Sequence, residues 1–147
     1  MSSGRAKNCT TVVFADTNIV VYAYGVVPSK IAVAEAILKS APVISTQVIN
    51  EFHNIARRKL GLDMATRHRV ADDLLQSCHV IAVGPSIVKA AMGIESRYQL
   101  SYWDALILAA ALASGCDTLL SEDMQDGQVF EGRLTVKNPF AALPSAA

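Results

Sequence analysis

The chain has 147 residues, 52% of them apolar, and its 13 Lys and Arg residues balance its 13 Asp and Glu residues. This length and apolar fraction support one domain with a full core and exclude a disordered chain, while a net charge of zero does not by itself indicate a nucleic-acid-binding protein. The sequence shows no secretory signal, and its longest apolar stretch, residues 105–113, is far below the roughly 20 residues that span a bilayer, so we expect a cytoplasmic protein with no membrane partner.

Short apolar strands alternate with longer helices along most of the chain. Residues 1–10 and 141–147 show neither pattern, and we expect flexible ends there. Expected strands are 11–16, 43–45, 79–83, 117–121 and 134–136, and expected helices are 18–24, 29–40, 47–60, 63–76, 86–99 and 102–113. This alternation predicts an α/β fold, in which a single domain over residues 11–140 has a central parallel β-sheet covered by helices on both faces.

Two acids lie near junctions between expected strands and helices. Asp16 directly follows the β-branched apolar run of the first strand. Asp is also a preferred residue immediately before a helix, so a capping role alone would explain it. Glu51 lies on the margin of the apolar stripe of helix 47–60, whereas a solvated Glu usually lies on the opposite face. A pairing with a nearby Arg would also account for Glu51.

The stretch over residues 101–123 contributes two more acids. Helix 102–113 is apolar on every side except at Asp104, which predicts a buried helix. Ser101 and Asp104 have the spacing of a capping box, so this acid too has a structural explanation. Gly115 suits the end of that helix, and the short strand that follows delivers Asp123 just beyond its own end. The carboxyl ends of strands in open α/β sheets are where ligands bind.

Together, the four acids predict a metal site. A parallel sheet gathers Asp16, Glu51, Asp104 and Asp123 at one edge, and crowded carboxylates are unstable unless they are protonated or bound to a cation. Oxygen ligands without Cys or paired His favour Mg²⁺ or Mn²⁺ over zinc. Such a site polarises phosphate oxygens and activates water, so the residues point to metal-assisted hydrolysis of phosphoesters.

A cluster of cations accompanies these acids. Its members are Arg57, Arg58, Lys59, Arg67 and Arg69. A cationic surface beside an anionic pocket suits a polyanion such as RNA, although solvated helix faces produce the same pattern.

Other residue types give weaker signals. Cys9, Cys78 and Cys116 are widely spaced and odd in number, which argues against a disulfide framework and a zinc site, and we interpret them as ordinary thiols. His53 and His68 have no partner at ligand spacing, and we expect them at the surface. The chain contains no Gly-rich phosphate loop.

The motifs that carry these acids resemble those of the PIN-domain family over residues 11–140. The matching segments are FADTN at residues 14–18, STQVINEFHNIARR around Glu51, YWDALI at residues 102–107 and LLSED at residues 119–123. The resemblance implies a PIN-like nuclease domain, a Mg²⁺- or Mn²⁺-dependent endoribonuclease, and most often the toxin of a VapBC-type toxin–antitoxin pair. It also implies a homodimer and a small antitoxin as partner.

By this resemblance the metal-binding and catalytic residues are Asp16, Glu51, Asp104 and Asp123, with Thr17, Asn18 and Ser121 as supporting polar groups. The fourth acid of the family is its least regular, and Glu122 and Asp126 compete with Asp123 for that position. We favour Asp123 because it is nearest the strand end.

Two other functions remain open. A phosphatase that forms an aspartyl-phosphate also begins with an acid after the first strand, but it needs a second Asp where this chain has Asn18. A non-catalytic PIN-like module that binds another protein would suit the zero net charge and high apolar content. Binding of Mn²⁺ at the four acids would distinguish the nuclease from the binding module. The sequence does not identify the RNA target or the antitoxin.

Overall fold

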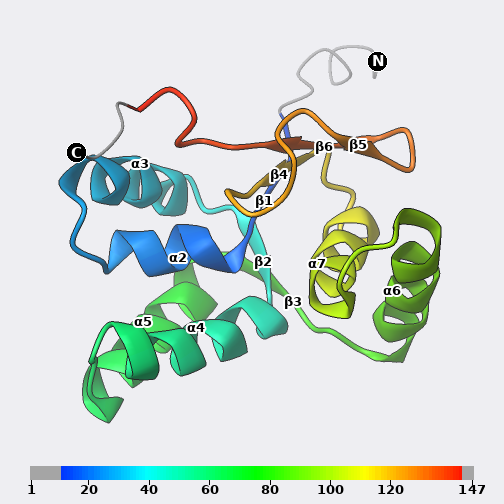
Figure 1. Cartoon of the computed structure of the whole chain (residues 1–147). Coiled ribbons are helices and arrows are strands. Elements are labelled where there is room, and N and C mark those ends of the chain that lie inside the picture. Colours follow the sequence, from blue (N-terminus) through cyan, green and yellow to red (C-terminus); the bar gives the residue numbers. More distant parts are fainter. Residues whose placement is uncertain (1–10, 144–147) are drawn as a thin grey trace, which may run out of the picture.

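The computed structural model of the chain describes residues 11–143 and has the alternating strands and helices that the sequence predicts (Figure 1). The strands are β1 (Val13–Ala15), β2 (Val43–Ser45), β3 (His79–Ile81), β4 (Thr118–Leu120), β5 (Val129–Phe130) and β6 (Leu134–Lys137). The helices are α2 (Thr17–Ala23), α3 (Pro28–Lys39), α4 (Thr46–Lys59), α5 (Met64–Ser77), α6 (Pro85–Tyr98) and α7 (Tyr102–Ala113). The expectations for residues 1–10 and 144–147 lie outside the described residues, and Leu143 packs against the core.

The strands form one sheet in the order β3-β2-β1-β4-β6-β5. All neighbouring strands run parallel except β5 and β6, so the predicted parallel α/β sheet is confirmed for its main part. Helices α2 and α3 lie on one side of the sheet, and α6 and α7 lie on the other (Figure 1). The chain leaves β1 toward β2 on one side and returns to pair β4 on the other. Ligands bind in open α/β sheets at such a switch in strand order.

The core lies between the sheet and its helices. Phe14, Ile44 and Leu119, one from each of three adjacent strands, are fully buried. Residues 105–112 of α7 are all buried, as expected for a helix that is apolar on every side. Gly115 has a φ of 75°, a left-handed conformation that suits glycine, and it turns the chain from α7 toward β4. Asp104, at the start of this rigid helix, is therefore held in a fixed place relative to the sheet.

The antiparallel strand β5 is the one element that the sequence did not predict. It lies within the expected loop between Asp123 and β6, and only two residues form it. A strand of this length shows no periodicity of its own, and it forms here by pairing with the free side of β6, so that β5 becomes the edge of the sheet.

Other expectations from the sequence can be checked against the fold. Cys78 and Cys116 are buried free thiols, and Cys9 lies outside the described residues. Among residues 11–143 no single helix is long and apolar enough to cross a membrane, and only the pair α2 and α3, bent by 120°, has the combined length and composition.

Candidate active site

Asp16 is the buried centre of the candidate site. It directly follows β1 and is the residue before α2, with 5% of its surface exposed. Its Oδ1 accepts a hydrogen bond from the Thr17 backbone N–H at 2.7 Å, and its Oδ2 accepts one from the Ser121 hydroxyl at 2.7 Å. Asp16 therefore does cap α2, as one interpretation of the sequence proposed, and a second contact ties it to the end of β4.

Ser121 connects Asp16 to Asp123. Its hydroxyl donates to Asp16 and accepts from the Asp123 backbone N–H at 3.1 Å, and the residue is fully buried. Asp123 itself is exposed, and its Oδ2 accepts from Asn18 Nδ2 at 3.0 Å. The supporting residues that the family resemblance implied here, Asn18 and Ser121, thus contact two of the four acids.

Glu51 is held by one hydrogen bond to each of its oxygens. Thr17 Oγ1 donates to Oε1 at 2.5 Å, and Gln47 Nε2 donates to Oε2 at 3.0 Å. Gln47 also donates to the backbone oxygen of Trp103 at 3.3 Å, which joins α4 to α7. Gln47 lies four residues before Glu51 on the same helix face, and this spacing could have identified it from the sequence.

Asp104 lies in the first turn of α7 and is half-buried. The Ser101 hydroxyl accepts a hydrogen bond from the Asp104 backbone N–H at 3.1 Å, so Ser101 caps the helix. In the described structure no hydrogen bond runs from the Ser101 backbone N–H to the Asp104 carboxylate. The capping box is therefore half formed, and Ser101 also acts on the Asp104 carboxyl group, whose pKa it lowers against the larger raising effect of burial.

One pocket of about 470 Å³ is lined by the four acids and by two of the five cations, Arg58 and Lys59. The other three cations, Arg57, Arg67 and Arg69, do not line it. The Arg67 guanidinium instead donates to the Leu62 backbone oxygen and contacts the His53 ring. The structure thus brings together all four predicted acids and divides the predicted basic cluster.

Burial and neighbouring charge raise the pKa of two of the acids, Asp16 and Asp104. Burial raises the pKa of Asp16 from 3.8 to about 7, and the charges of Asp123 and Asp104 add to this against the lowering effect of the hydrogen bonds from Ser121 and Thr17. Burial likewise raises the pKa of Asp104, and the charges of Asp123 and Glu51 act in the same direction. A bound cation would relieve both the burial cost and the repulsion.

The donor set fits a hard divalent cation, since the pocket presents carboxylate oxygens without a thiolate or an imidazole. Asp16, Glu51, Asp104 and Asp123 are the residues that would hold it. Within residues 11–143, however, no three His, Cys, Asp or Glu side chains are already arranged as a finished metal-binding group. Carboxylates repel one another in the absence of a cation, which works against such an arrangement.

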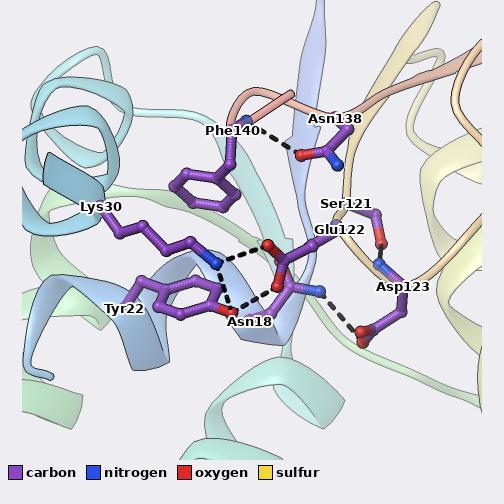
Figure 2. A network of polar contacts seen from close by, with 8 residues as sticks. All are labelled: Asn18, Tyr22, Lys30, Ser121, Glu122, Asp123, Asn138 and Phe140. Carbon is purple, nitrogen blue, oxygen red and sulfur yellow. Dashed lines mark hydrogen bonds and ion pairs between the residues drawn. The ribbon is translucent and has the colours of Figure 1, made fainter. Parts of the chain in front are cut away.

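The two rivals of Asp123 are engaged elsewhere. Glu122 reaches the edge of the pocket, but its carboxylate accepts hydrogen bonds from the Tyr22 hydroxyl and, at 2.7 Å, from the Lys30 ammonium group. Figure 2 shows Glu122 directed toward Tyr22 and Lys30, while Asp123 is directed toward Asn18. Asp126 accepts from the Asn138 backbone N–H at 2.8 Å and does not line the pocket. The geometry therefore favours Asp123.

Glu122 belongs to a small cage that the sequence analysis missed. The Lys30 ammonium group lies 4.2 Å from the centre of the Tyr22 ring and donates to the Tyr22 hydroxyl at 3.0 Å. The Phe140 ring meets the Tyr22 ring edge-on at 4.9 Å (Figure 2). The cage fixes the residue before Asp123 against α2 and α3. Ninety-two positions separate Lys30 from Glu122, so no local spacing could have revealed their contact.

Solved structures of several known proteins share the fold of this chain. A toxin–antitoxin complex from Klebsiella pneumoniae is similar at 21% identity and a TM-score of 0.66, covering 86% of this chain and 97% of that one. The Mycobacterium tuberculosis toxin VapC20, described as cleaving the sarcin–ricin loop, is similar at 19% identity and a TM-score of 0.63, covering 76% and 91%. VapBC2 from Rickettsia felis, bound to a promoter DNA fragment, is similar at 19% identity and a TM-score of 0.62, covering 86% and 97%.

A search of curated protein sequences finds no match. The family model of the PIN domain matches residues 13–125, a segment that contains all four acids. The chain belongs to the PIN-domain family.

Proposed function

We propose that the protein is a Mg²⁺- or Mn²⁺-dependent endoribonuclease that hydrolyses RNA phosphodiesters. The observation that carries the proposal is the convergence of four acids from separate segments of the chain on one pocket beside two cations. A divalent cation held there would polarise the scissile phosphate and activate water.

The residues of the chain have separable roles in this proposal. Asp16 is buried and fixed by hydrogen bonds to both of its carboxylate oxygens. The Ser121 hydroxyl contacts both Asp16 and the Asp123 backbone and so fixes the position of Asp123 relative to Asp16. Thr17 and Gln47 orient Glu51. Arg58 and Lys59 bind phosphates of the RNA strand on the α4 side of the pocket.

Incubation of the purified protein with single-stranded RNA and Mn²⁺ tests the proposal. We expect products with a 5′-phosphate and a 3′-hydroxyl, and we expect EDTA to abolish cleavage. Asp16→Asn should be inactive, whereas Asp126→Asn, a matched change of an acid outside the pocket, should retain activity. Products that end in a 2′,3′-cyclic phosphate would exclude attack by water, because they form when the RNA's own 2′-hydroxyl attacks.

We further propose that the protein is the toxin of a VapBC-type pair, that it forms a homodimer and that a small antitoxin binds it. The similar structures include toxin–antitoxin complexes, which supports such a partner. Helix α2 uses Ile19 and Val20 in the core and so offers little apolar surface to a partner. Exposed apolar side chains that could contact one include Val26, between α2 and α3, and Met64 and Leu75 on α5.

The two alternative functions, a phosphatase and a protein-binding module, require different features of the site. An aspartyl-phosphate mechanism needs an acid at residue 18, where the amide of Asn18 donates to Asp123. A protein-binding module needs no cation. If the protein neither gains stability from Mn²⁺ nor cuts RNA, the binding module is the better description.

A further inference from the structure

We propose that a second pocket beside the acid site binds one unpaired base of the RNA strand, with Trp103 as the stacking surface and the amides of Asn50, Asn54 and Gln47 as hydrogen-bonding groups. The proposal deepens the proposed function, on which it rests for the class of the ligand. The base would belong to a nucleotide next to the phosphate that is cut.

The second pocket adjoins the first. It has a volume of about 540 Å³, within the range of ligand-binding pockets. Glu51, Asn54 and Trp103 line both pockets. Trp103 immediately precedes Asp104 in α7, so a group bound against its ring lies one residue from the carboxylates.

The exposure of Trp103 to solvent is unusual for a large aromatic side chain. Its side chain is 61% exposed in a helix whose residues 105–112 are all buried. Aromatic rings beside nucleic-acid channels stack on single-stranded bases of any sequence. An exposed ring next to a phosphate-cutting site is therefore suited to hold an unpaired base.

The opposite wall of the pocket is a row of polar side chains on α4. Thr46, Asn50 and Asn54 recur every four residues and so share one face of the helix. The same spacing leads from Asn54 to Arg58, which lines the acid pocket. An amide offers both hydrogen-bond donors and acceptors, as the edge of a base requires. Arg58 continues the row of polar side chains on α4 into the acid pocket, where phosphates of the RNA would lie.

Gln47 adds an independent observation. It is only 8% exposed, and its Nε2 donates to Glu51 Oε2 and to the Trp103 backbone oxygen. Both partners are acceptors, so this orientation of the amide is required, and Oε1 must face elsewhere. That buried oxygen has no hydrogen-bond partner in the described structure. Buried polar atoms are normally paired, so this oxygen leaves a hydrogen bond unmade beside the pocket, and a small movement of the side chains that cover it would open it to a donor group of a base.

Two features favour RNA over a protein partner as the occupant. The walls carry three amides beside the apolar side chains of Val83, Trp103 and Leu106, and the pocket adjoins a site with acids for a cation and cations for phosphates. A second copy of the chain or an antitoxin segment would instead place a side chain over Trp103, and the test below separates these cases.

Trp103 is the single tryptophan of the chain, so fluorescence excited where tyrosine does not absorb reports on the surroundings of this ring alone. The experiment uses the full chain carrying Asp16→Asn, in EDTA, so that RNA is bound and not cut. A short single-stranded RNA is titrated and compared with a ribose-phosphate chain of equal length that lacks bases. We expect the RNA to quench the fluorescence and the abasic chain to leave it unchanged.

Variants in the same background test the energetics by anisotropy of labelled RNA. Trp103→Ala should weaken RNA binding by about 5- to 150-fold, the cost of losing one stacked base, and should leave binding of the abasic chain unaltered. Trp103→Phe should retain most of the affinity. The matched control is Met92→Ala, which removes another exposed apolar side chain that lines neither pocket.

Equal binding of RNA and abasic chain, or full RNA affinity in Trp103→Ala, would overturn the proposal. So would a fluorescence that changes with protein concentration alone, since a second copy would then cover Trp103. In the otherwise wild-type enzyme, Trp103→Ala should raise KM with little effect on kcat. If the wild type cuts no RNA but the base-dependent quenching persists, the nuclease proposal fails and the base pocket stands.

Discussion

At the scale of single residues, the buried carboxylate of Asp16 lowers the stability of the folded protein at neutral pH. Its pKa of about 7 in the folded protein lies above its ordinary value of 3.8, because the carboxylate is buried near other acids. The folded state therefore binds more protons than the unfolded state between these two values, and its stability falls as the pH rises from about 4 to about 7.

Replacement of Asp16 by Asn should reverse this loss. Three pKa units correspond to about 4 kcal/mol between the two protonation states, and the amide lacks one acceptor oxygen, so we expect Asp16→Asn to be about 1–3 kcal/mol more stable than wild type at pH 8 in EDTA. The difference should nearly vanish at about pH 3, where the wild-type carboxyl is mostly protonated in both states. Urea unfolding at both pH values measures it, and an equal difference at both would disprove the role of ionisation.

Asp104 separates a structural role from a role in metal binding. The N-terminal cap of α7 comes from Ser101 and survives the change Asp104→Asn. Because Asp123 and Glu51 repel the Asp104 carboxylate, the metal-free variant should melt no lower than metal-free wild type. Mn²⁺ at about 100 times its dissociation constant should stabilise only the wild type, by about 2.7 kcal/mol.

Thermal melting with and without Mn²⁺, followed by an RNA cleavage assay, tests Asp104. A variant that melts lower without metal, still gains stability from Mn²⁺ and still cuts RNA would make Asp104 a structural residue. That result would remove it from the four-acid site.

At the scale of elements, the segment after β4 depends on α2 and α3. Lys30 from α3 and Tyr22 from α2 hold Glu122, and Asn18 from α2 holds Asp123 (Figure 2). Burial alone would raise the pKa of Glu122, but the contacts with the Lys30 ammonium and the Tyr22 hydroxyl lower it below its ordinary value. This contribution is therefore present above the ordinary carboxyl pKa and is lost as the pH falls through the lowered value.

A double-mutant cycle with Lys30→Met and Glu122→Gln tests this cage. The pair is partly exposed, so we expect a coupling of about 0.2–1 kcal/mol at pH 7 that disappears in acid. Lys30→Met should also raise the Mn²⁺ concentration needed for half-maximal cleavage, because Asp123 follows Glu122 directly. Lys89→Met, on α6, is the matched control and should change neither quantity. Unaltered metal dependence in Lys30→Met would limit the cage to a structural role.

At the scale of the whole molecule, the order of the strands assembles the site. Because β1 lies between β2 and β4, the residues after β1 and β4 meet at the switch in strand order. Asn18 and Asp123, 105 positions apart, come within hydrogen-bonding distance there. Helices α4 and α7 then add Glu51 and Asp104 to the same pocket.

The proposed biological role gives a prediction at this scale. Expression of the protein alone should slow growth of the host cell, and co-expression of a small cognate partner should relieve the effect. Asp16→Asn should be harmless at equal expression, because toxicity would depend on cleavage. Growth curves with matched protein levels measure this. Normal growth together with RNA cleavage in vitro would argue for a role in RNA processing instead.

The sequence by itself determined the elements and the identity of the acids. Local rules suffice for these features: Gly115 ends α7, the apolar run before Asp16 forms β1, and an acid on an otherwise apolar helix marks Asp104 as exceptional. The fold class follows from the same alternation of strands and helices. The short strand β5 was not predicted, because two residues are too few to show the alternation of a strand and because its pairing depends on β6.

Only the tertiary structure decided which side chains share a pocket. Of the basic cluster, only Arg58 and Lys59 line the acid pocket. Glu122 pairs with Lys30, and Asp126 accepts a hydrogen bond from Asn138. Trp103 and Gln47 lie beside the acids. These contacts join residues far apart in the chain, so no local spacing encodes them. The raised pKa of Asp16 has the same origin, because burial and neighbouring charge exist only once the sheet has brought the segments together.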